Sequence, residues 1–255
     1  MSERNADCLL RMRGVWTEQK TEGMRCRLEV PTLELVRGRF LVVVGATGGR
    51  KRALIDLLTF MAQPTGANEF SCLDINRVGA GCAVDVAGLW RDRDHAALSS
   101  LRSRLLGQPW VSSSLLPFLS VMENIQWPYE MLGTEDQARV RELARCLGIS
   151  ETLNRSIAFL SEHQRQRVLL IRALLHKPSV VLLDEPTTCM DRSQAELVFE
   201  ELSTLASRDN VGVVLISRDR DLAQGRADQL LGFKTRHETD EQRISELIPL
   251  ISARH

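Results

Sequence analysis

The segment from Val180 to Pro186, with the sequence VVLLDEP, constrains the fold more than any other part of the chain. Four apolar residues run directly into two acids and a proline. A short apolar run that ends at a chain breaker is typical of a parallel strand buried on both faces. Open α/β sheets bind ligands beyond the carboxyl ends of such strands. Asp184 and Glu185 are therefore candidate site residues, and the alternative is a solvated acidic turn.

A glycine-rich segment, GATGGRKR, follows a second apolar run, Phe40–Val44. Glycine amides and one lysine are the groups that cradle phosphate where a strand runs into a helix. The candidate phosphate-binding residues are Gly45, Gly48, Gly49, Arg50, Lys51 and Arg52. In the pattern Gly-x-x-x-x-Gly-Lys-Ser/Thr, Arg50 replaces the last glycine and Arg52 replaces the hydroxyl residue.

These two arginines change what the segment can bind. An arginine cannot ligate Mg²⁺, and a Cβ at a position of positive φ costs about 1 kcal/mol or more. Both effects oppose a magnesium–nucleotide complex. The alternative is that Arg50 and Arg52 grip phosphate directly and replace the charge of the metal.

A third motif precedes the acidic strand. The segment LSEHQ, at residues 160–164, opens a helical run that ends near Leu175, and DEPT follows at residues 184–187. Together with the glycine-rich segment, these motifs resemble the ATP-binding-cassette (ABC) ATPases over nearly the whole chain. In that family an LSGGQ signature opens the helix before the Walker B strand, and a D-loop follows it.

The resemblance implies ATP and Mg²⁺ as cofactors. Asp184 is the implied Mg²⁺ ligand, and Glu185 is the residue that polarises the attacking water. Arg218 stands where the family has its switch histidine, and it keeps positive charge but cannot take a proton. The implied nucleotide-binding residues of the signature and the D-loop are Ser161, Gln164 and Asp191.

Glu162 and His163 occupy the positions of the signature glycines. A carboxylate placed where phosphate should arrive is repelled in a poorly hydrated site, and His163 offsets this only when protonated. Helix capping by Ser161 and Glu162 explains the same residues without a ligand, and we favour that interpretation.

Two further contacts are implied by the family. Trp16 is the aromatic residue nearest to the loop that stacks on adenine, and ordinary packing explains it equally well. Residues 105–125 resemble the Q-loop region of the lipoprotein-release and macrolide-export branch. The Q-loop glutamine falls on Val111, while Gln108 lies three residues early.

The same region is implied to dock an integral membrane permease, through the segment around Trp110–Trp127. Its apolar anchors are of the kind that interfaces use. They are Trp110, Leu115, Leu116, Phe118 and Trp127. Packing within a helical subdomain is the alternative for each of them.

The fold class that follows is α/β, namely a P-loop NTPase core with a mainly parallel sheet, an antiparallel β subdomain and an inserted α-helical subdomain. We divide the chain into residues 8–90 (β subdomain and Walker A core), 91–165 (helical subdomain), 166–233 (Walker B and switch core) and 234–255 (a C-terminal helix). Residues 67–81 are expected to be partly an insertion, with a turn at residues 84–88.

The composition narrows the function classes. The 33 basic and 33 acidic residues balance, which gives no support to nucleic acid as a partner. The six cysteines lack metal-ligand spacing. No apolar run approaches the roughly 18–20 residues that span a bilayer, and the amino terminus lacks the form of a signal peptide. We therefore expect a peripheral protein at the cytoplasmic face of the cell membrane.

Three hypotheses remain. The first is a pseudo-ATPase subunit of an exporter for lipoprotein or another hydrophobic cargo, which docks a permease and pairs with a second cassette, identical or different. The second is an active but atypical ATPase that drives that export, with Arg50, Arg52 and Arg218 holding phosphate. The third, a soluble regulatory ABC protein, usually needs two fused cassettes.

Overall fold

The computed structural model describes residues 7–21, 24–45, 49–74, 82–108, 115–130, 136–188, 190–239 and 242–251. The strands are β1 (Cys8–Thr21), β2 (Met24–Val36), β3 (Phe40–Val44), β4 (Glu69–Asp74), β5 (Cys82–Asp85), β6 (Leu106–Gly107), β7 (Val180–Asp184), β8 (Gly212–Ser217), β9 (Gln229–Thr239) and β10 (Gln242–Ile251). The helices are α1 (Gly49–Leu58), α2 (Val86–Arg91), α3 (His95–Leu105), α4 (Val121–Glu130), α5 (Gln137–Cys146), α6 (Glu162–Leu174), α7 (Arg192–Asp209) and α8 (Arg220–Ala223), with short 3₁₀ turns at Ser150–Thr152 and Ile157–Phe159. These strands form one sheet in the order β5-β4-β1-β2-β10-β9-β3-β8-β7-β6.

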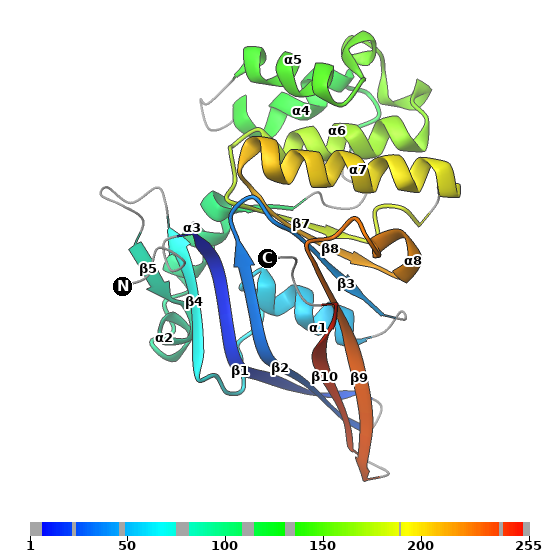
Figure 1. Cartoon of the computed structure of the whole chain (residues 1–255). Coiled ribbons are helices and arrows are strands. Elements are labelled where there is room, and N and C mark those ends of the chain that lie inside the picture. Colours follow the sequence, from blue (N-terminus) through cyan, green and yellow to red (C-terminus); the bar gives the residue numbers. More distant parts are fainter. Residues whose placement is uncertain are drawn as a thin grey trace.

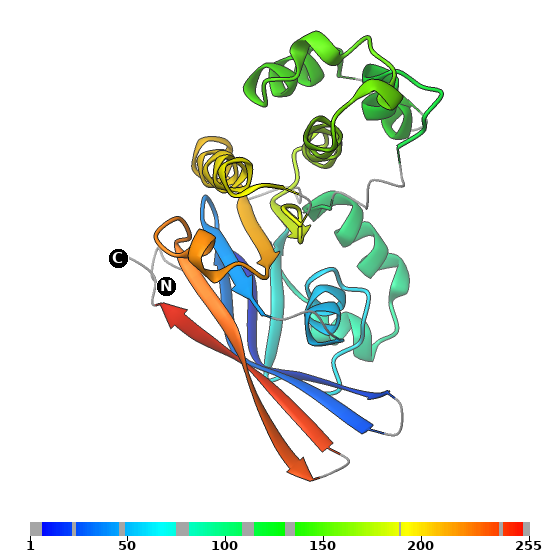
Figure 2. The same cartoon turned by 90° about the vertical axis from the view of Figure 1, so that its right-hand side faces the viewer.

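One half of the sheet is parallel and buried on both faces. Strand β3 pairs in parallel with β8 and β9, and β7 pairs in parallel with β8 and β6. Phe40 and Val42 belong to the hydrophobic core with α6 and α7, whereas Leu41 and Val43 belong to the core with α1 and α3. This alternation follows from the two-residue period of a strand. Figure 2 shows α1 and α3 on one face of the sheet and α7 on the other, so the predicted α/β fold is confirmed.

The other half is an antiparallel flank. Strands β1, β2, β4 and β5 pair antiparallel, and β10 joins the two halves by pairing in parallel with β2 and antiparallel with β9. Part of the expected insertion is therefore a regular strand, β4, and residues 75–81 lie outside the described residues. The turn expected at residues 84–88 is instead the end of β5 and the start of α2.

The prediction of a helix over residues 234–255 was wrong, because residues 234–239 continue β9 and residues 242–251 form β10. Ile244, Leu247, Ile248 and Ile251 recur at a helical period, which suggested a helix. Pairing on both edges of β10 overrides that local pattern. Pro249, which would break a helix, lies at a register irregularity where a strand tolerates proline.

Helices α4, α5 and α6 gather at one end of the molecule, and both α6 and α7 lie next to the sheet (Figures 1 and 2). Their apolar faces share a single core that includes Ile125, Val140 and Ile171. Of the helices in the described residues, none is long and apolar enough to span a membrane.

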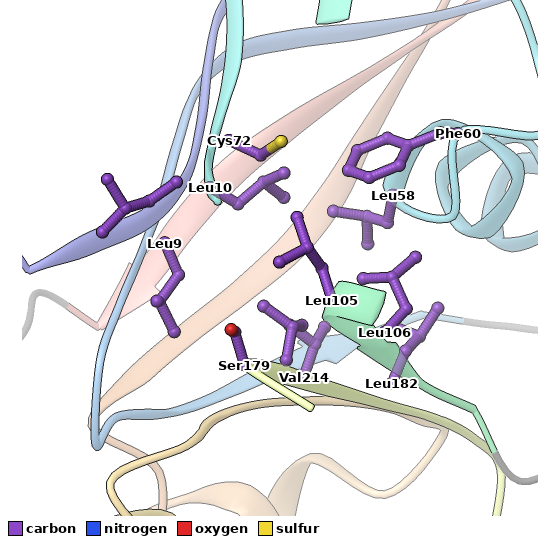
Figure 3. A pocket seen from close by; sticks show the side chains of 12 residues that line it. Leu9, Leu10, Leu58, Phe60, Cys72, Leu105, Leu106, Ser179, Leu182 and Val214 are labelled. Atoms are coloured by element: carbon purple, nitrogen blue, oxygen red, sulfur yellow. The ribbon is translucent and has the colours of Figure 1, made fainter. Parts of the chain in front are cut away.

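The core that joins the flank to the parallel strands is closely packed. It contains a small cavity of about 10 Å³ beside Phe60, Cys72 and Ser179. Figure 3 shows the side chains that line it. A space of this size is barely enough for one water. Burial raises the pKa of Cys72 to about 12, so this thiol stays protonated and packs as a small apolar residue.

Candidate functional site

The candidate site lies at the carboxyl ends of β3, β7 and β8, where the parallel strands meet. The amide of Gly45 donates to the carbonyl of Ser217 over 3.2 Å, and the amide of Glu185 donates to the carbonyl of Ile216 over 2.9 Å. These bonds extend the strand pairing beyond the sheet edge. They bring the start of the glycine-rich segment, the acidic strand end and the segment around Arg218 together, as the sequence predicts.

Lys51, at the start of α1, is buried in this site with only 5% of its surface exposed. Its ammonium group contacts one carboxylate oxygen of Glu185 and donates to the carbonyl of Ser217 over 3.2 Å. Arg218 lies on the other side, with its Nε 3.0 Å from the second oxygen of Glu185. One carboxylate therefore bridges two cations, as charge-assisted hydrogen bonds favour.

Thr188 and the backbone hold this carboxylate in place. The Thr188 hydroxyl donates to the Glu185 carbonyl over 3.0 Å, and Arg218 donates to the Thr188 oxygen over 3.3 Å. Glu185 itself has a φ of +50°, a left-handed conformation uncommon outside glycine, asparagine and aspartate. Such strain persists only where the surrounding structure fixes it, and it is frequent at functional sites. Sequence reasoning did not identify Thr188 or Ser217 as site residues, although they lie in the segments that resemble the D-loop and the switch motif.

Arg50 and Arg52 point to different neighbours. Arg52, two-thirds exposed, pairs with Asp56 one turn further along α1 over 3.0 Å. Arg50 reaches β9, where it contacts the Thr235 hydroxyl and lies 5.8 Å from the ring of Phe233. A Cβ on Gly45 would come within 2.7 Å of that ring, so Phe233 explains this glycine by close packing.

The residues present fit a phosphate better than they fit Mg²⁺. Lys51 stands at the position where the Walker A pattern has its lysine, although its ammonium group is paired with the Glu185 carboxylate. Gly49 is the first residue of α1. The hydroxyl that the Walker A pattern supplies to the metal is replaced by the Arg52 guanidinium, whose charge opposes a cation. Gly48 lies outside the described residues.

Asp184, the implied metal ligand, ends β7 beside Glu185. The surrounding protein and the Glu185 carboxylate raise the pKa of Asp184, while Lys51 and Arg52 act in the opposite direction. Its side chain remains open to solvent, which screens these effects. The position is therefore one where added positive charge would be favourable.

Ser161 and Asp191 are helix caps. Ser161 starts α6 and accepts from the amide of Gln164, whose side chain accepts from the amide of Ser161 in return. Asp191 starts α7 with the same reciprocal pair, here with Gln194. The helix-capping prediction for Ser161 is confirmed. Within the described residues, no hydrogen bond or ion pair links either helix start to Lys51.

His163 connects the two helix starts. Its Nε2 lies 2.5 Å from Oε1 of Gln194, the residue that closes the cap of α7. The signature segment and the D-loop segment are thus held side by side by a bond that the sequence did not predict. Capping donors at two adjacent helix starts also make this edge favourable for an anion.

Trp16 lies in the middle of β1, whereas Lys51 lies in α1, which follows the end of β3. The guanidinium of Arg27 stacks over its ring at 4.0 Å, and the backbone of Gly66 packs against its indole edge. These contacts favour the packing interpretation, because adenine would have to displace Arg27 to use that ring face.

The segment expected to dock a permease divides into buried and exposed residues. Leu115 is buried, whereas Phe118 and Trp127 are 78% and 48% exposed. The side-chain amide of Asn124 fixes the turn that carries Phe118, because it donates to the carbonyls of Leu116, Leu119 and Ser120. Trp110 and Val111 lie outside the described residues.

A further exposed aromatic residue, Phe159, was missed by sequence reasoning. Its side chain is 82% exposed, and the bridge between Ser120 and Ser156 holds its 3₁₀ turn beside the turn that carries Phe118. Two exposed aromatic side chains therefore lie on adjoining turns. No sequence signal distinguishes Phe159, because it directly precedes Leu160, which is buried in the core.

The comparisons with known proteins agree on the family. The sequence profile described as ABC transporter matches residues 28–188. The chain is 33% identical over 204 residues to the lipoprotein-releasing system ATP-binding protein LolD of Acinetobacter baylyi, covering 78% of this chain and 83% of that one. It is 32% identical over 206 residues to the macrolide export ATP-binding/permease protein MacB of Brucella melitensis, covering 80% of this chain but 29% of that longer protein.

Solved structures give the same result for the fold. The dimeric ABC transporter cassette MJ0796 superposes with a TM-score of 0.66 at 22% identity, covering 88% of this chain and 94% of that one. CbiO1 of Clostridium perfringens, part of the ABC transporter complex cbiONQ, superposes with a TM-score of 0.71 at 17% identity, covering 93% of this chain and 87% of that one. The chain therefore belongs to the ABC transporter family, whose ATP-binding cassettes bind ATP and Mg²⁺.

Proposed function

We propose that this chain is the cassette subunit of a membrane export complex for lipoprotein or another hydrophobic cargo, with impaired or absent ATP hydrolysis. In this role it docks a permease and holds or transmits a conformation, at the cytoplasmic face of the membrane. The names of the relatives support this class of cargo. The exposed side chains of Phe118, Trp127 and Phe159 support a docking role.

The observation that carries the proposal is the bridging carboxylate of Glu185. In a working site this carboxylate faces an attacking water. Here both of its oxygens are engaged, one by Lys51 and the other by Arg218. The lysine that would hold phosphate and the acid that would polarise water are therefore bonded to each other. Arg52 adds positive charge where a metal would bind.

Turnover of the purified chain tests this proposal. We expect magnesium-dependent ATP hydrolysis at the level of a buffer blank, both alone and with its permease, and the same level for Glu185→Gln. Robust hydrolysis that Glu185→Gln abolishes would overturn the proposal. Replacing Arg50 by Gly and Arg52 by Thr together should strengthen magnesium–nucleotide binding at least tenfold in calorimetry, because the metal regains a hydroxyl ligand. Arg91→Ser, at an exposed arginine of α2, is the matched control.

A second candidate function is an active but atypical ATPase in the same complex. It is favoured by the side chains of Asp184, Glu185 and Lys51, which lie together at the sheet edge. In this case nucleotide phosphates displace Glu185 from Lys51 and draw on Arg50, Arg52 and Arg218 for charge. A flat calorimetric trace at millimolar ATP and Mg²⁺ would contradict this alternative.

A second cassette is the other proposed partner, identical to this one or different. Within the described residues, no hydrogen bond or ion pair joins the caps at Ser161 and Asp191 to Lys51, which supports a site completed by another chain. Sedimentation of the purified chain with and without nucleotide tests for a homodimer. A mixed pair would instead appear as a second cassette in the purified membrane complex.

A further inference from the structure

A small cavity lies between α6, the end of β7 and α7. Its volume is about 40 Å³. Leu170 of α6, Leu183 of β7 and Leu202 of α7 form apolar parts of its wall, and Met190 lines it just before α7 begins. Because an apolar cavity of about 150 Å³ holds one benzene molecule, 40 Å³ leaves room for about two heavy atoms. The cavity is therefore too small for a nucleotide or a peptide and suits a very small ligand.

One polar group of the wall needs a donor. Gln166, on α6, is among the lining residues, and its side-chain oxygen Oε1 is buried. Among the residues that the structure describes, no group donates a hydrogen bond to this oxygen. A buried acceptor without a donor costs free energy, and most such groups in folded proteins are paired with protein atoms or with ordered water. This oxygen is therefore a binding group for a small molecule that carries a donor.

The charged groups of the wall are already matched. Arg167 and Glu201 both line the cavity and pair with each other over 2.9 Å. His163 contacts Oε1 of Gln194 through its Nε2, 2.5 Å away. A charged ligand would enter a mostly apolar space without an unmatched counter-charge to meet it, which is unfavourable. The cavity thus favours a neutral donor, and a hydroxyl group is the simplest one.

The cavity lies where three segments with sequence motifs meet. His163 belongs to the segment that resembles the signature, Pro186 directly follows Glu185, and Met190 directly precedes Asp191, the cap of α7. These three lining residues are half-buried, so solvent can reach the cavity. A molecule bound there would fill the space between the segments and couple their positions.

We propose that this cavity binds neutral hydroxyl compounds of about two heavy atoms, which donate a hydrogen bond to Oε1 of Gln166. Two ordered waters and one molecule of methanol share this chemistry. The apolar wall accommodates the carbon of an alcohol, whereas two waters bond to each other as well as to Gln166. The inference is independent of the proposed function, because it requires neither a nucleotide nor a permease.

Nuclear magnetic resonance of the full chain, isotope-labelled at its methionine methyl groups, tests the proposal. Met190 lines the cavity, and its resonance is assigned with Met190→Leu. Met61 is 47% exposed and serves as the internal control for effects of methanol on the solvent. We expect the Met190 resonance to move along a saturating curve as methanol is added, and the Met61 resonance to drift linearly. Without methanol, we expect a nuclear Overhauser effect from water to the Met190 methyl group.

Two variants of the wall and one control extend the test. Gln166→Leu removes the acceptor and should weaken methanol binding about fivefold, as expected for one neutral hydrogen bond. Gln137→Leu, at an exposed glutamine of α5, should leave the curve unchanged. Val198→Ile adds a methylene group to the wall and should abolish saturation, and it serves if Gln166→Leu fails to fold. A melting temperature within a few degrees of the original chain verifies folding.

The outcomes separate the two sources of the hydroxyl group. A water Overhauser effect without a saturating methanol curve identifies ordered water as the ligand, and a saturating curve without that effect identifies a small alcohol. A linear drift at Met190 with no water Overhauser effect would overturn the proposal, and so would a saturating curve that Gln166→Leu and Val198→Ile leave unchanged. The proposed function stands in each of these cases, because none of them measures ATP hydrolysis or docking.

Discussion

At the scale of single residues, Glu185 is the side chain on which most of the site depends. Its carboxylate lies between two cations, the nearly fully buried ammonium group of Lys51 and the guanidinium group of Arg218. Replacing it by glutamine keeps an oxygen acceptor but removes the negative charge. Lys51 would then remain buried without a counter-ion, and such a loss is costly.

We therefore expect Glu185→Gln to destabilise the chain by roughly 1–3 kcal/mol. Urea unfolding measures the change. Glu151→Gln, at an exposed glutamate, is the matched control and should stay within about 0.5 kcal/mol of the original. Equal stability of the two variants would mean that the bridge contributes nothing to folding.

Residue-level prediction from the sequence succeeded where chemistry is tied to a motif. Asp184, Glu185 and Lys51 were placed at one sheet edge because parallel strands share their carboxyl ends. The contacts between them could not be predicted, because the position of Arg218 against Glu185 depends on a strand register that the sequence does not show. Arg50 likewise finds Phe233 and Thr235 on β9, whose second half was predicted to be helical.

At the scale of elements, His176 couples three of them. It links β6 to the ends of α4 and α6 through Leu106 and Tyr129, and Tyr129 bonds in turn to the carbonyl of Arg172. Burial lowers the pKa of His176 below 6.5, so the folded chain favours the neutral ring. The hydrogen bond to the carbonyl of Leu106 acts in the opposite direction, and burial is the larger effect.

The sign of the pH effect follows. Because the folded pKa is the lower one, the stability that the neutral ring contributes is complete above pH 6.5 and is lost as the pH falls below it. We expect the melting temperature to fall between about pH 7.5 and 5.5, and His176→Gln to remove part of that fall. His237→Gln, at an exposed histidine, should leave the slope unchanged, and an unchanged slope in His176→Gln as well would contradict the prediction.

Elements with strong local signals were predicted well. Strands β3 and β7 were identified from uninterrupted apolar runs, and α6 from the motif and the cap at its start. Elements that depend on pairing with distant strands were not predicted well. Strand β4 is recognised through its pairing with β1 and β5, and the start of α2 follows a short, largely exposed strand that resembles a turn.

At the scale of the whole molecule, β10 determines whether the sheet is one structure or two. Leu247 is 3% exposed and belongs to the core shared by the flank and the parallel strands. Leu247→Ala should cost about 2–4 kcal/mol in urea unfolding, as for other core leucines. Ile248 points to the other face of the sheet and is partly exposed, so Ile248→Ala should lower the free energy of unfolding by less. Equal losses would indicate that β10 packs like a peripheral element.

The position of β10 between β2 and β9 has a consequence for synthesis of the chain. Its partners on β2 lie near the start of the sequence, so translation must pass residue 242 before the two halves of the sheet can meet. Until then the nascent flank carries an unpaired strand edge while it is still attached to the ribosome. Open edges of this length invite wrong pairings between neighbouring chains. We therefore expect the sheet to close only after β10 has been synthesised.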